Sequence, residues 1–255
     1  MNSIKSIYYH NPSPVQFERT VCWLLSKGYR FISCEELYHS FSHRCPIQEK
    51  LVYLSLDDAW RSNLLLVPIL EKYHVPITIF VPVEPIEKGN YWWEYVPREE
   101  REKYKKMDYA DFCDAISVLR DKHVLVRSCV TSGELMTLAR HPLVSIQSHT
   151  VTHPILTVLP KELLREELKR SKERLENMID CEVNFFSYPN GTYTAREVEA
   201  ARDIYKMAFT TDLHDITYKD DIMALPRIEI TGRYQRDKLK FYNIWPIIRK
   251  ICLLR

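Results

Sequence analysis

Two adjacent carboxylates and two histidines are the side chains of this sequence best suited to act together. Asp57 and Asp58 close a strand-like run, and His149 and His153 follow far downstream, separated by Thr-Val-Thr. Two imidazoles and one carboxylate form a common ligand set for a divalent metal with open positions. The second carboxylate is then left to act on water, so the pattern is typical of a hydrolase.

Each pair also has a simpler explanation. Asp57 and Asp58 could cap the helix expected to begin near Arg61. The histidines could be unrelated surface residues, and Pro154 favours an extended conformation at His153, unlike the helical metal motif of zinc proteases. Both pairs nevertheless follow predicted strands, at the edge where parallel barrels place catalysis. Together they favour a metal site.

Short apolar runs alternate with amphipathic segments along the chain, and this order predicts the fold class. Strands are predicted at Lys5–Tyr9, Tyr29–Ser33, Leu51–Leu56, Ile77–Val83, Leu143–Gln147, Val183–Tyr188, Lys206–Thr211 and Ala224–Ile230. Helices are predicted at Pro14–Lys27, Cys34–Ser40, Asn63–Tyr73, Ser132–Ala139, Pro160–Ile179 and Thr194–Ile204. The alternation indicates an α/β fold with a parallel sheet, either open or closed into a barrel.

One stretch interrupts this alternation. Residues 84–130 carry Trp92-Trp93 and further amphipathic segments, which predicts a helical insertion after a strand. In barrels, insertions at this end of a strand build the rim of the active site. With 255 residues, of which 45% are hydrophobic, the chain is long enough for one barrel, and we predict a single domain over residues 1–255.

Composition excludes several function classes. The formal net charge of +2 comes from 36 basic and 34 acidic residues that are scattered along the chain, so no nucleic-acid partner is expected. The seven cysteines form no C-x-x-C pair and are expected to be reduced thiols. The sequence shows neither a secretion signal nor an apolar run of membrane-spanning length, which predicts a cytoplasmic location.

The tail, residues 238–255, mixes aromatic, aliphatic and basic side chains. This mixture is compatible with peripheral contact with the anionic inner face of a membrane. Docking onto the barrel, or onto a second subunit, is the simpler alternative. Pro246 limits the tail to short helical pieces.

Three motifs in order resemble the polysaccharide deacetylases of the NodB-homology type, also called carbohydrate esterase family 4. Leu54-Ser-Leu-Asp-Asp-Ala resembles their T-F-D-D-G, Ser148-His-Thr-Val-Thr-His-Pro resembles S-H-T-x-x-H-P, and Phe186-Ser-Tyr-Pro-Asn-Gly resembles the third motif. The resemblance runs from Lys5 to about Thr231 and includes Leu225-Pro-Arg-Ile. It implies a distorted (β/α) TIM-like barrel and metal-dependent removal of N-acetyl or O-acetyl groups from a sugar.

The resemblance also assigns roles by position. Asp57 would be the general base, and Asp58, His149 and His153 would hold a divalent metal, most often zinc, with cobalt, nickel or iron as alternatives. Water activated by the metal and by this base would attack the acetyl carbonyl.

The general acid departs from the main family pattern. Most members take it from an L-x-H motif near the C-terminus, but Asp212-Leu-His214 is out of place for that motif. The subgroup that resembles the biofilm poly-N-acetylglucosamine deacetylases takes it from an N-terminal Tyr-His or Phe-His sequence. Tyr9-His10 matches this pattern, so His10 is the predicted acid, and an ordinary surface histidine is the alternative.

The remaining site predictions concern the third motif and the tryptophans. Ala59 replaces the glycine of the first motif, Ser187 replaces the arginine of the third, and Asn190 replaces its tyrosine. Since Pro189-Asn-Gly is a turn sequence, the backbone N–H of Asn190 is expected to face an oxyanion. Each of three aromatic residues has a functional and a structural interpretation. Tyr188 either lines the pocket or belongs to the core. Trp92 and Trp93 either stack on a sugar or attach the insertion to the barrel.

Two main functions follow. The first is a metal-dependent deacetylase acting on a sugar or glycan intermediate, with N-acetyl groups favoured over O-acetyl groups. The second is a catalytically inactive relative that binds glycan, suggested by the missing L-x-H motif and the altered third motif. The same machinery acting on a non-sugar amide is a third possibility. The intact set of two aspartates and two histidines favours an enzyme, because a binding module has no chemical need for a free carboxylate beside a metal.

Overall fold

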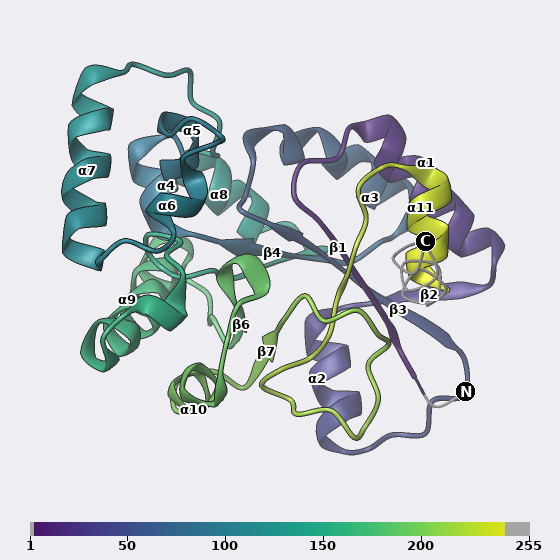
Figure 1. Ribbon diagram of the computed structural model, residues 1–255. Coiled ribbons are helices and arrows are strands. Elements are labelled where there is room, and N and C mark those ends of the chain that lie inside the picture. Colours follow the sequence, from purple (N-terminus) through teal and green to yellow (C-terminus); the bar gives the residue numbers. More distant parts are fainter. Residues whose placement is uncertain (1–2, 243–255) are drawn as a thin grey trace, which may run out of the picture.

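A parallel sheet forms the centre of the protein in the computed structural model, which describes residues 3–242 (Figure 1). Its strands are β1 (Lys5–Tyr9), β2 (Tyr29–Ile32), β3 (Lys50–Asp57), β4 (Ile77–Val81), β5 (Val144–Ser148), β6 (Phe185–Ser187), β7 (Met207–Phe209) and β8 (Ile228–Glu229). They are hydrogen-bonded in the order β7-β6-β5-β4-β3-β1-β8, and β2 also pairs with β3. All pairs between these strands are parallel, and each predicted strand is present.

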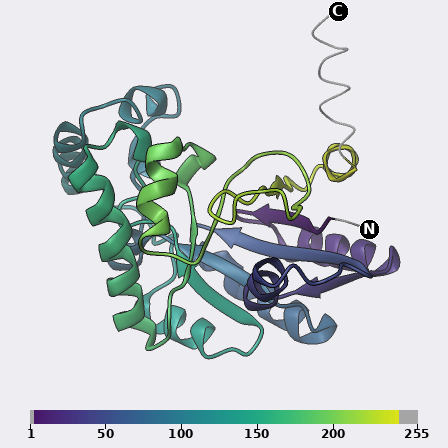
Figure 2. The ribbon, with the colours of Figure 1, turned by 90° about the horizontal axis from the view of Figure 1, so that it is seen from below.

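Helices connect the strands and cover the outside of the sheet. The longer elements outside the insertion are α1 (Pro14–Ser26), α2 (Cys34–Ser42), α3 (Val67–Tyr73), α8 (Ser132–Ala139), α9 (Lys161–Ile179), α10 (Ala195–Arg202) and α11 (Tyr234–Phe241). Three short 3-10 turns complete them at Arg61–Leu66, Leu156–Val158 and Pro189–Gly191. The predicted helices are present, although Asn63–Tyr73 divides into a 3-10 turn and α3. Figure 2 shows α9 and α10 side by side on one flank.

The sheet curls around aromatic side chains that fill its interior. Tyr53 of β3 stacks on Phe209 of β7, with ring centroids 4.9 Å apart, and Phe80 of β4 lies 5.4 Å from the same ring. All three residues are fully buried. Burying large aromatic surfaces from strands on opposite sides of the curl stabilises the curved shape.

An irregular segment closes the gap between the two edge strands. Leu225 donates its N–H to Ala208 O at 2.9 Å, and Thr210 donates its N–H to Leu225 O at 2.8 Å, so residues 222–225 run beside β7 before the chain enters β8. β8 then pairs with β1. The predicted distorted (β/α) barrel is therefore confirmed, with its closure made by a connecting segment instead of two regular strands.

The predicted helical insertion follows β4. It consists of α4 (Val83–Lys88), α5 (Trp92–Tyr95), α6 (Arg101–Tyr104) and α7 (Tyr109–Lys122), seen at the left of Figure 1. A small core of its own, formed by Trp92, Val96, Phe112 and Ile116, holds α5 and α7 together. The insertion starts at the carboxyl end of β4, so it lies beside the edge of the barrel where the motif residues are expected.

The tail prediction falls mostly outside the described residues. Residues 238–242 belong to α11 and its end, and there Phe241 packs between Trp23 and Tyr29, with ring centroids 4.9 and 5.4 Å away. This part of the tail docks onto the barrel. Among the described residues, no helix is both long enough and apolar enough to span a bilayer. Membrane contact by residues 243–255 stays a prediction.

Because α11 docks on the barrel, substitutions of two neighbouring aromatic residues at its end should differ greatly in their effect on the free energy of unfolding. Phe241→Ala should lower the free energy of unfolding by about 3–5 kcal/mol, because the ring is fully buried and its removal leaves a cavity. Tyr242→Ala is the matched control, since that side chain is 47% exposed, and it should cost less than about 1 kcal/mol. Denaturant unfolding measures both. Equal, small losses would show that α11 does not pack on the barrel in solution.

Candidate functional site

The motif residues meet at the carboxyl edge of the sheet. Asp57 is the last residue of β3, His149 directly follows β5, His10 directly follows β1, and Asn190 lies in the turn after β6. Because parallel strands end at the same edge, residues far apart in sequence come together around one cavity of about 410 Å³. The cavity is lined by these four residues, by Asp58 and His153, and by residues of the insertion.

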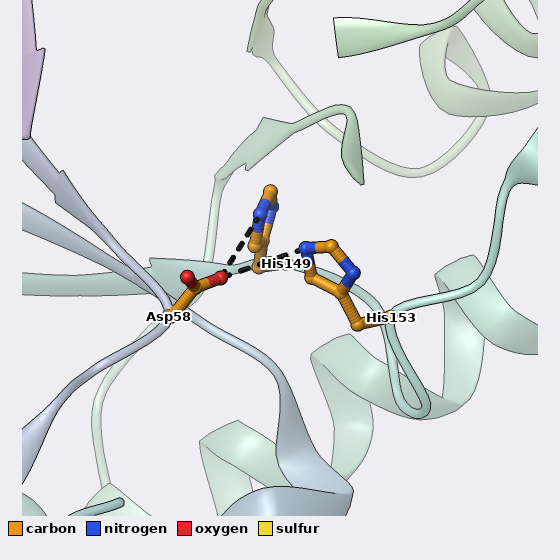
Figure 3. Close-up of side chains that lie close together, drawn as sticks. All are labelled: Asp58, His149 and His153. Carbon is orange, nitrogen blue, oxygen red and sulfur yellow. Dashed lines mark ion pairs between the residues drawn. The ribbon is translucent and has the colours of Figure 1, made fainter. Parts of the chain in front are cut away.

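Asp58, His149 and His153 form the candidate metal group. One ligand atom from each lies within 4.8 Å of the others. The Asp58 Oδ1 atom is 3.8 Å from His149 Nε2 and 3.5 Å from His153 Nε2, and both rings point toward the carboxylate (Figure 3). All three side chains are buried or nearly so.

The hydrogen bonds of the group leave its metal-facing atoms free. His149 Nδ1 lies 2.7 Å from Ser187 O, and since a carbonyl only accepts, Nδ1 carries the proton and Nε2 keeps a lone pair toward Asp58. Asp58 Oδ2 accepts from Trp60 Nε1 at 3.2 Å, whereas Oδ1 is buried without a hydrogen-bond partner among the described residues. A buried carboxylate oxygen that faces two imidazole nitrogens fits a divalent cation.

The charges of the group agree with this fit. Burial lowers the pKa of His149, and it lowers the pKa of His153 still further with help from the neighbouring His149, so both rings are neutral and can act as ligands. Burial raises the pKa of the Asp58 carboxyl. A bound cation would offset this burial cost, because it favours the ionised form.

Strained backbone sets the direction of these side chains. Asp58, Ala59, Thr150 and His153 all have positive φ, between 57° and 76°. Residues with side chains adopt this region at a cost of about 1–3 kcal/mol each, and such residues cluster at functional sites. Asp57 and Asp58 do not cap the following turn, which begins after Trp60 and has no side-chain cap, so that explanation is wrong.

The loop between the two histidines is held by Glu167 of α9. Its buried carboxylate accepts the N–H groups of Val151 and Thr152 at 2.8 and 3.1 Å. The same carboxylate accepts the Thr152 hydroxyl at 3.0 Å and the Tyr109 hydroxyl of the insertion at 2.6 Å. Four donors on one buried carboxylate fix the loop, and with it the spacing of the two imidazoles.

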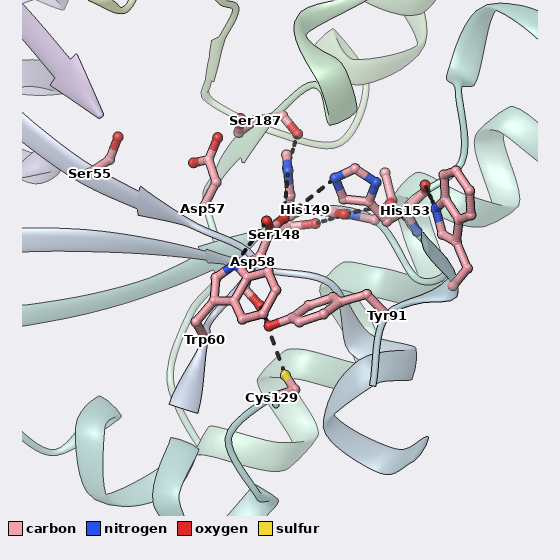
Figure 4. Close-up of polar contacts among 12 residues, drawn as sticks. Ser55, Asp57, Asp58, Trp60, Tyr91, Cys129, Ser148, His149, His153 and Ser187 are labelled. Atoms are coloured by element: carbon pink, nitrogen blue, oxygen red, sulfur yellow. Dashed lines mark hydrogen bonds and ion pairs between the residues drawn. The ribbon is translucent and has the colours of Figure 1, made fainter. Parts of the chain in front are cut away.

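The turn that carries Asp58 is anchored from the insertion side. Tyr91 donates its hydroxyl to Asp58 O at 2.9 Å, and Cys129 Sγ contacts Ala59 O at 3.4 Å. The polar contacts around this turn and the two histidines are drawn in Figure 4. Loops from both sides therefore hold the candidate metal group in place.

Asp57 has a different environment from its neighbour, because it pairs with Arg227. The two guanidinium Nη atoms donate to Asp57 Oδ1 at 2.7 Å and to Oδ2 at 2.8 Å. Burial acts to raise the pKa of Asp57, but the charge of Arg227 and its hydrogen bonds outweigh it and hold the pKa below its usual value. Asp57 is therefore ionised, and each of its oxygens keeps a lone pair for another contact.

Arg227 is fully buried, and each of its five N–H groups can be used. Besides Asp57, it donates to Ser55 Oγ, Ser187 Oγ and Thr210 O. The guanidinium also lies 4.4 Å from the centre of the Tyr8 ring. The sequence predicted no arginine beside the base, because Ser187 stands at the usual position in the third motif. The structure places Arg227 there instead, and Ser187 accepts a bond from it.

His10 lies at the cavity, on the end of β1, with an exposed side chain. Its carbonyl accepts from Asn63 Nδ2 at 3.3 Å, which fixes the backbone at this point. His214, the residue nearest to an L-x-H pattern, does not line the cavity; it is exposed, and its ring contacts Asp215 O. Among the described residues, three histidines line the cavity: His149 and His153 of the candidate metal group, and His10.

A family model described as polysaccharide deacetylase matches residues 46–207. The chain belongs to that family. It is 25% identical over 218 residues to YxkH of Bacillus subtilis (strain 168), a protein whose name assigns it to the polysaccharide deacetylases, and the match covers 85% of this chain and 64% of YxkH. The chain thus spans less than two thirds of that relative.

Solved structures of deacetylases share the fold. The deacetylase PplD of Streptococcus pyogenes, solved in complex with acetate, superposes with a TM-score of 0.70 at 22% identity, covering 91% of this chain and 93% of PplD. IcaB from Ammonifex degensii gives a TM-score of 0.69 at 20% identity, with the same coverage of 91% and 93%. The fold of this deacetylase-family protein is therefore that of known deacetylases.

Two other predicted site residues, Tyr188 and Asn190, lie at the cavity in different ways. Tyr188 lines the cavity, but its ring is buried and its hydroxyl donates to Met223 O at 2.9 Å, which favours the core role. Asn190 is exposed, with φ of 57°, and its Oδ1 accepts from Lys105 Nζ at 3.3 Å. Its positive φ is the turn geometry that the Pro-Asn-Gly sequence predicts.

The two tryptophans line the cavity in different ways. Trp92 is buried in the core of the insertion and donates its Nε1 to His153 O at 3.2 Å, so it attaches the insertion to the histidine loop. Trp93 is half-buried, stacks on Tyr91 and packs edge-on against His153 with centroids 4.8 Å apart. Trp60, which the sequence did not single out, lines the same wall. Trp93 and Trp60 are therefore the tryptophans that offer partly exposed aromatic surface at the cavity.

Breaking the Arg227 pair should be far more damaging than removing both partners. Arg227→Met leaves Asp57 ionised and buried without a cation, and it should lower the free energy of unfolding by about 3–5 kcal/mol. The double variant Asp57→Leu with Arg227→Met should recover much of that loss, because no buried charge remains. Chemical denaturation measures both variants. Equal losses in the single and double variants would contradict a coupled buried pair.

Proposed function

We propose that the protein is a metal-dependent hydrolase that removes acetyl groups, N-acetyl in preference to O-acetyl, from a sugar or glycan intermediate. The strongest support is that two adjacent carboxylates, Asp57 and Asp58, have different environments. Asp58 faces two neutral imidazoles with an unpartnered oxygen, while Asp57 beside it is ionised and paired with Arg227. Membership of the polysaccharide deacetylase family supports the same chemistry.

Asp58, His149 and His153 would hold the metal, with zinc as the first candidate and cobalt, nickel or iron as alternatives. When bound, a divalent ion there supplies Lewis acidity toward the acetyl carbonyl and lowers the pKa of water. The three protein ligands leave positions open, as catalytic sites require. Ser187 O orients the His149 ring, and the Glu167 carboxylate fixes the loop before His153.

The remaining groups carry the proton transfers. Asp57 accepts a proton from the attacking water, because Arg227 keeps this carboxylate ionised and its oxygens keep free lone pairs. The acetyl C–N bond then breaks, and His10 gives a proton to the leaving nitrogen, so that acetate and a free amine are the products. The backbone N–H of Asn190 would stabilise the negative oxygen that forms in between.

The need for an acid favours N-acetyl over O-acetyl substrates. An amine leaves poorly unless it is protonated, whereas an alkoxide from an ester is a better leaving group, and a histidine that has access to the cavity supplies this proton. The alternative of an inactive glycan-binding relative is weakened by the same arrangement. Binding alone would not need an ionised carboxylate held by a buried arginine next to a metal-type ligand set. A cytoplasmic location stays part of the proposal.

Two substitutions should separate metal binding from base catalysis. His153→Ala should lose both bound metal and acetate release, because only two ligands remain. Asp57→Asn should retain metal yet lose turnover by at least about a hundredfold, because the base is gone. Elemental analysis and acetate release from N-acetylated sugars, with and without a chelator, measure these effects. Full activity in Asp57→Asn would remove the base assignment.

A histidine pair tests the source of the acid. His10→Ala should reduce kcat by about a hundredfold or more with an N-acetyl substrate, and less with an O-acetyl substrate, whose leaving group needs less protonation. His214→Ala is the matched control, since it removes an exposed histidine outside the cavity, and it should leave kcat unchanged. The opposite ranking of the two variants would place the acid in the C-terminal part of the chain.

A further inference from the structure

The wall that the insertion gives to the cavity is basic. Arg101 and Lys105 of this segment both line the cavity, and both side chains are half-buried there. They are four residues apart, which places them on the same side of the short α6 helix and the residue after it. Lys103, between them, is exposed and does not line the cavity. Arg101 and Lys105 therefore bring positive charge to the cavity, whereas the charge of Lys103 lies outside it.

The charged groups that line the cavity are otherwise accounted for within the described residues. Asp57 pairs with Arg227, and Asp58 faces the two imidazoles. Glu229, the last residue of β8, pairs with Lys240 at 3.2 Å. The carboxylates of the cavity thus have partners that do not include the basic residues of the insertion.

Of the two basic residues that the insertion contributes to the cavity, Arg101 has no carboxylate partner among the described residues, whereas Lys105 pairs with Glu102. The Arg101 Nε donates to Val96 O at 3.3 Å, which orients the guanidinium, and its two Nη groups have no partner there. Those two groups are the fork that binds a carboxylate or a phosphate through parallel hydrogen bonds. An oriented arginine fork at a cavity wall is suited to an anionic ligand.

Lys105 extends the same surface toward the loop after β6. Its Nζ lies 2.8 Å from Glu102 Oε1 and 3.3 Å from Asn190 Oδ1. Glu102 is mostly exposed, with 71% of its side chain accessible, so solvent screens this pair and much of the lysine charge is available. The two cations therefore span the cavity wall from the insertion to the turn that carries Asn190.

We propose that Arg101 and Lys105 form an anion-binding subsite, and that the acetylated sugar which this protein deacetylates carries a phosphate or a carboxylate group. This inference rests on the proposed function, because it concerns the substrate of the same cavity. The arginine fork binds two oxygens of the anion, and the lysine ammonium adds a second positive charge. The sugar ring then lies between this wall and the strand ends, beside Trp93.

Ligand binding tests the subsite without depending on turnover. Trp60, Trp92 and Trp93 line the cavity, so tryptophan fluorescence reports occupancy. Three probes share one scaffold: the neutral methyl glycoside of N-acetylglucosamine, N-acetylglucosamine 1-phosphate, and N-acetylglucosaminuronic acid. At least one anionic probe should bind about tenfold or more tightly than the neutral one, since a hydrogen-bonded charge pair has that effect on affinity. The anionic probe that binds more tightly shows whether the subsite prefers a phosphate or a carboxylate.

Substitutions of the three basic residues test which side chain causes the preference for an anionic probe. Arg101→Gln should abolish the preference for the anionic probe while leaving the affinity for the neutral probe within about twofold, and Lys105→Gln should reduce the preference. Lys103→Gln removes the same charge from the outer face of the helix and should keep the preference. Higher salt should weaken binding of the anionic probe only. Equal affinities for all three probes, no binding of any probe, or a preference that survives Arg101→Gln would overturn the proposal.

Acetate release from the same probes separates this proposal from the proposed function. Release from neutral and anionic probes at equal kcat/KM would leave the deacetylase intact and reject the subsite. Anion-dependent binding that requires Arg101, without acetate release from any probe, would reject the deacetylase and retain an anionic sugar ligand for the cavity. A kcat/KM that is about tenfold higher for an anionic probe, and lost in Arg101→Gln, would support both.

Discussion

The buried ion pair between Arg227 and Asp57 is the constraint on which the site depends. A guanidinium without access to water is tolerated only if its charge and its donors are satisfied. Arg227 meets this condition with groups from β3, β6 and the residue after β7. The arginine itself comes from the segment that enters β8, so a single side chain joins four parts of the barrel at its carboxyl edge. Fixing Asp57, the proposed base, and closing the barrel therefore depend on the same arginine side chain.

The pair also explains how two adjacent aspartates acquire different chemistry. Strand geometry alternates side chains, and Asp57, the last residue of β3, stays inside the barrel with Arg227. Asp58 has φ of 76°, which turns its carboxylate out of the strand pattern and toward His149 and His153. Arg227 lowers the pKa of the first carboxyl, whereas burial raises that of the second. One carboxylate is thus held ionised by the protein, and the other has the environment of a cation ligand.

Local pattern predicted the elements and brought the motif residues to one edge, because strand ends can be read from short apolar runs. It did not predict Arg227, which lies 170 residues from Asp57 in the chain. The Leu225-Pro-Arg-Ile sequence was recognised as part of the family resemblance, but only the fold shows that it fills the space left by Ser187. Glu167 was hidden in the same way: in a helix rich in glutamate and lysine, nothing local distinguishes the one carboxylate that turns inward.

The insertion forms hydrogen bonds to the loop of the two histidines, to Glu167 and to the turn that carries Asn190. Trp92 bonds the carbonyl of His153, Tyr109 bonds the carboxylate that fixes the histidine loop, and Lys105 bonds Asn190. The candidate catalytic and metal-binding side chains come from strand ends and the loops that follow them, whereas the insertion supplies one wall of the cavity. In the proposed function, changes in α6 would alter which sugar is bound without moving Asp57 or Asp58, whereas changes at Trp92 or Tyr109 would also disturb the loop that carries the two histidines. The proposed subsite would thus place substrate choice on Arg101, whose guanidinium bonds Val96 within the insertion, and on Lys105, which reaches the barrel through Asn190.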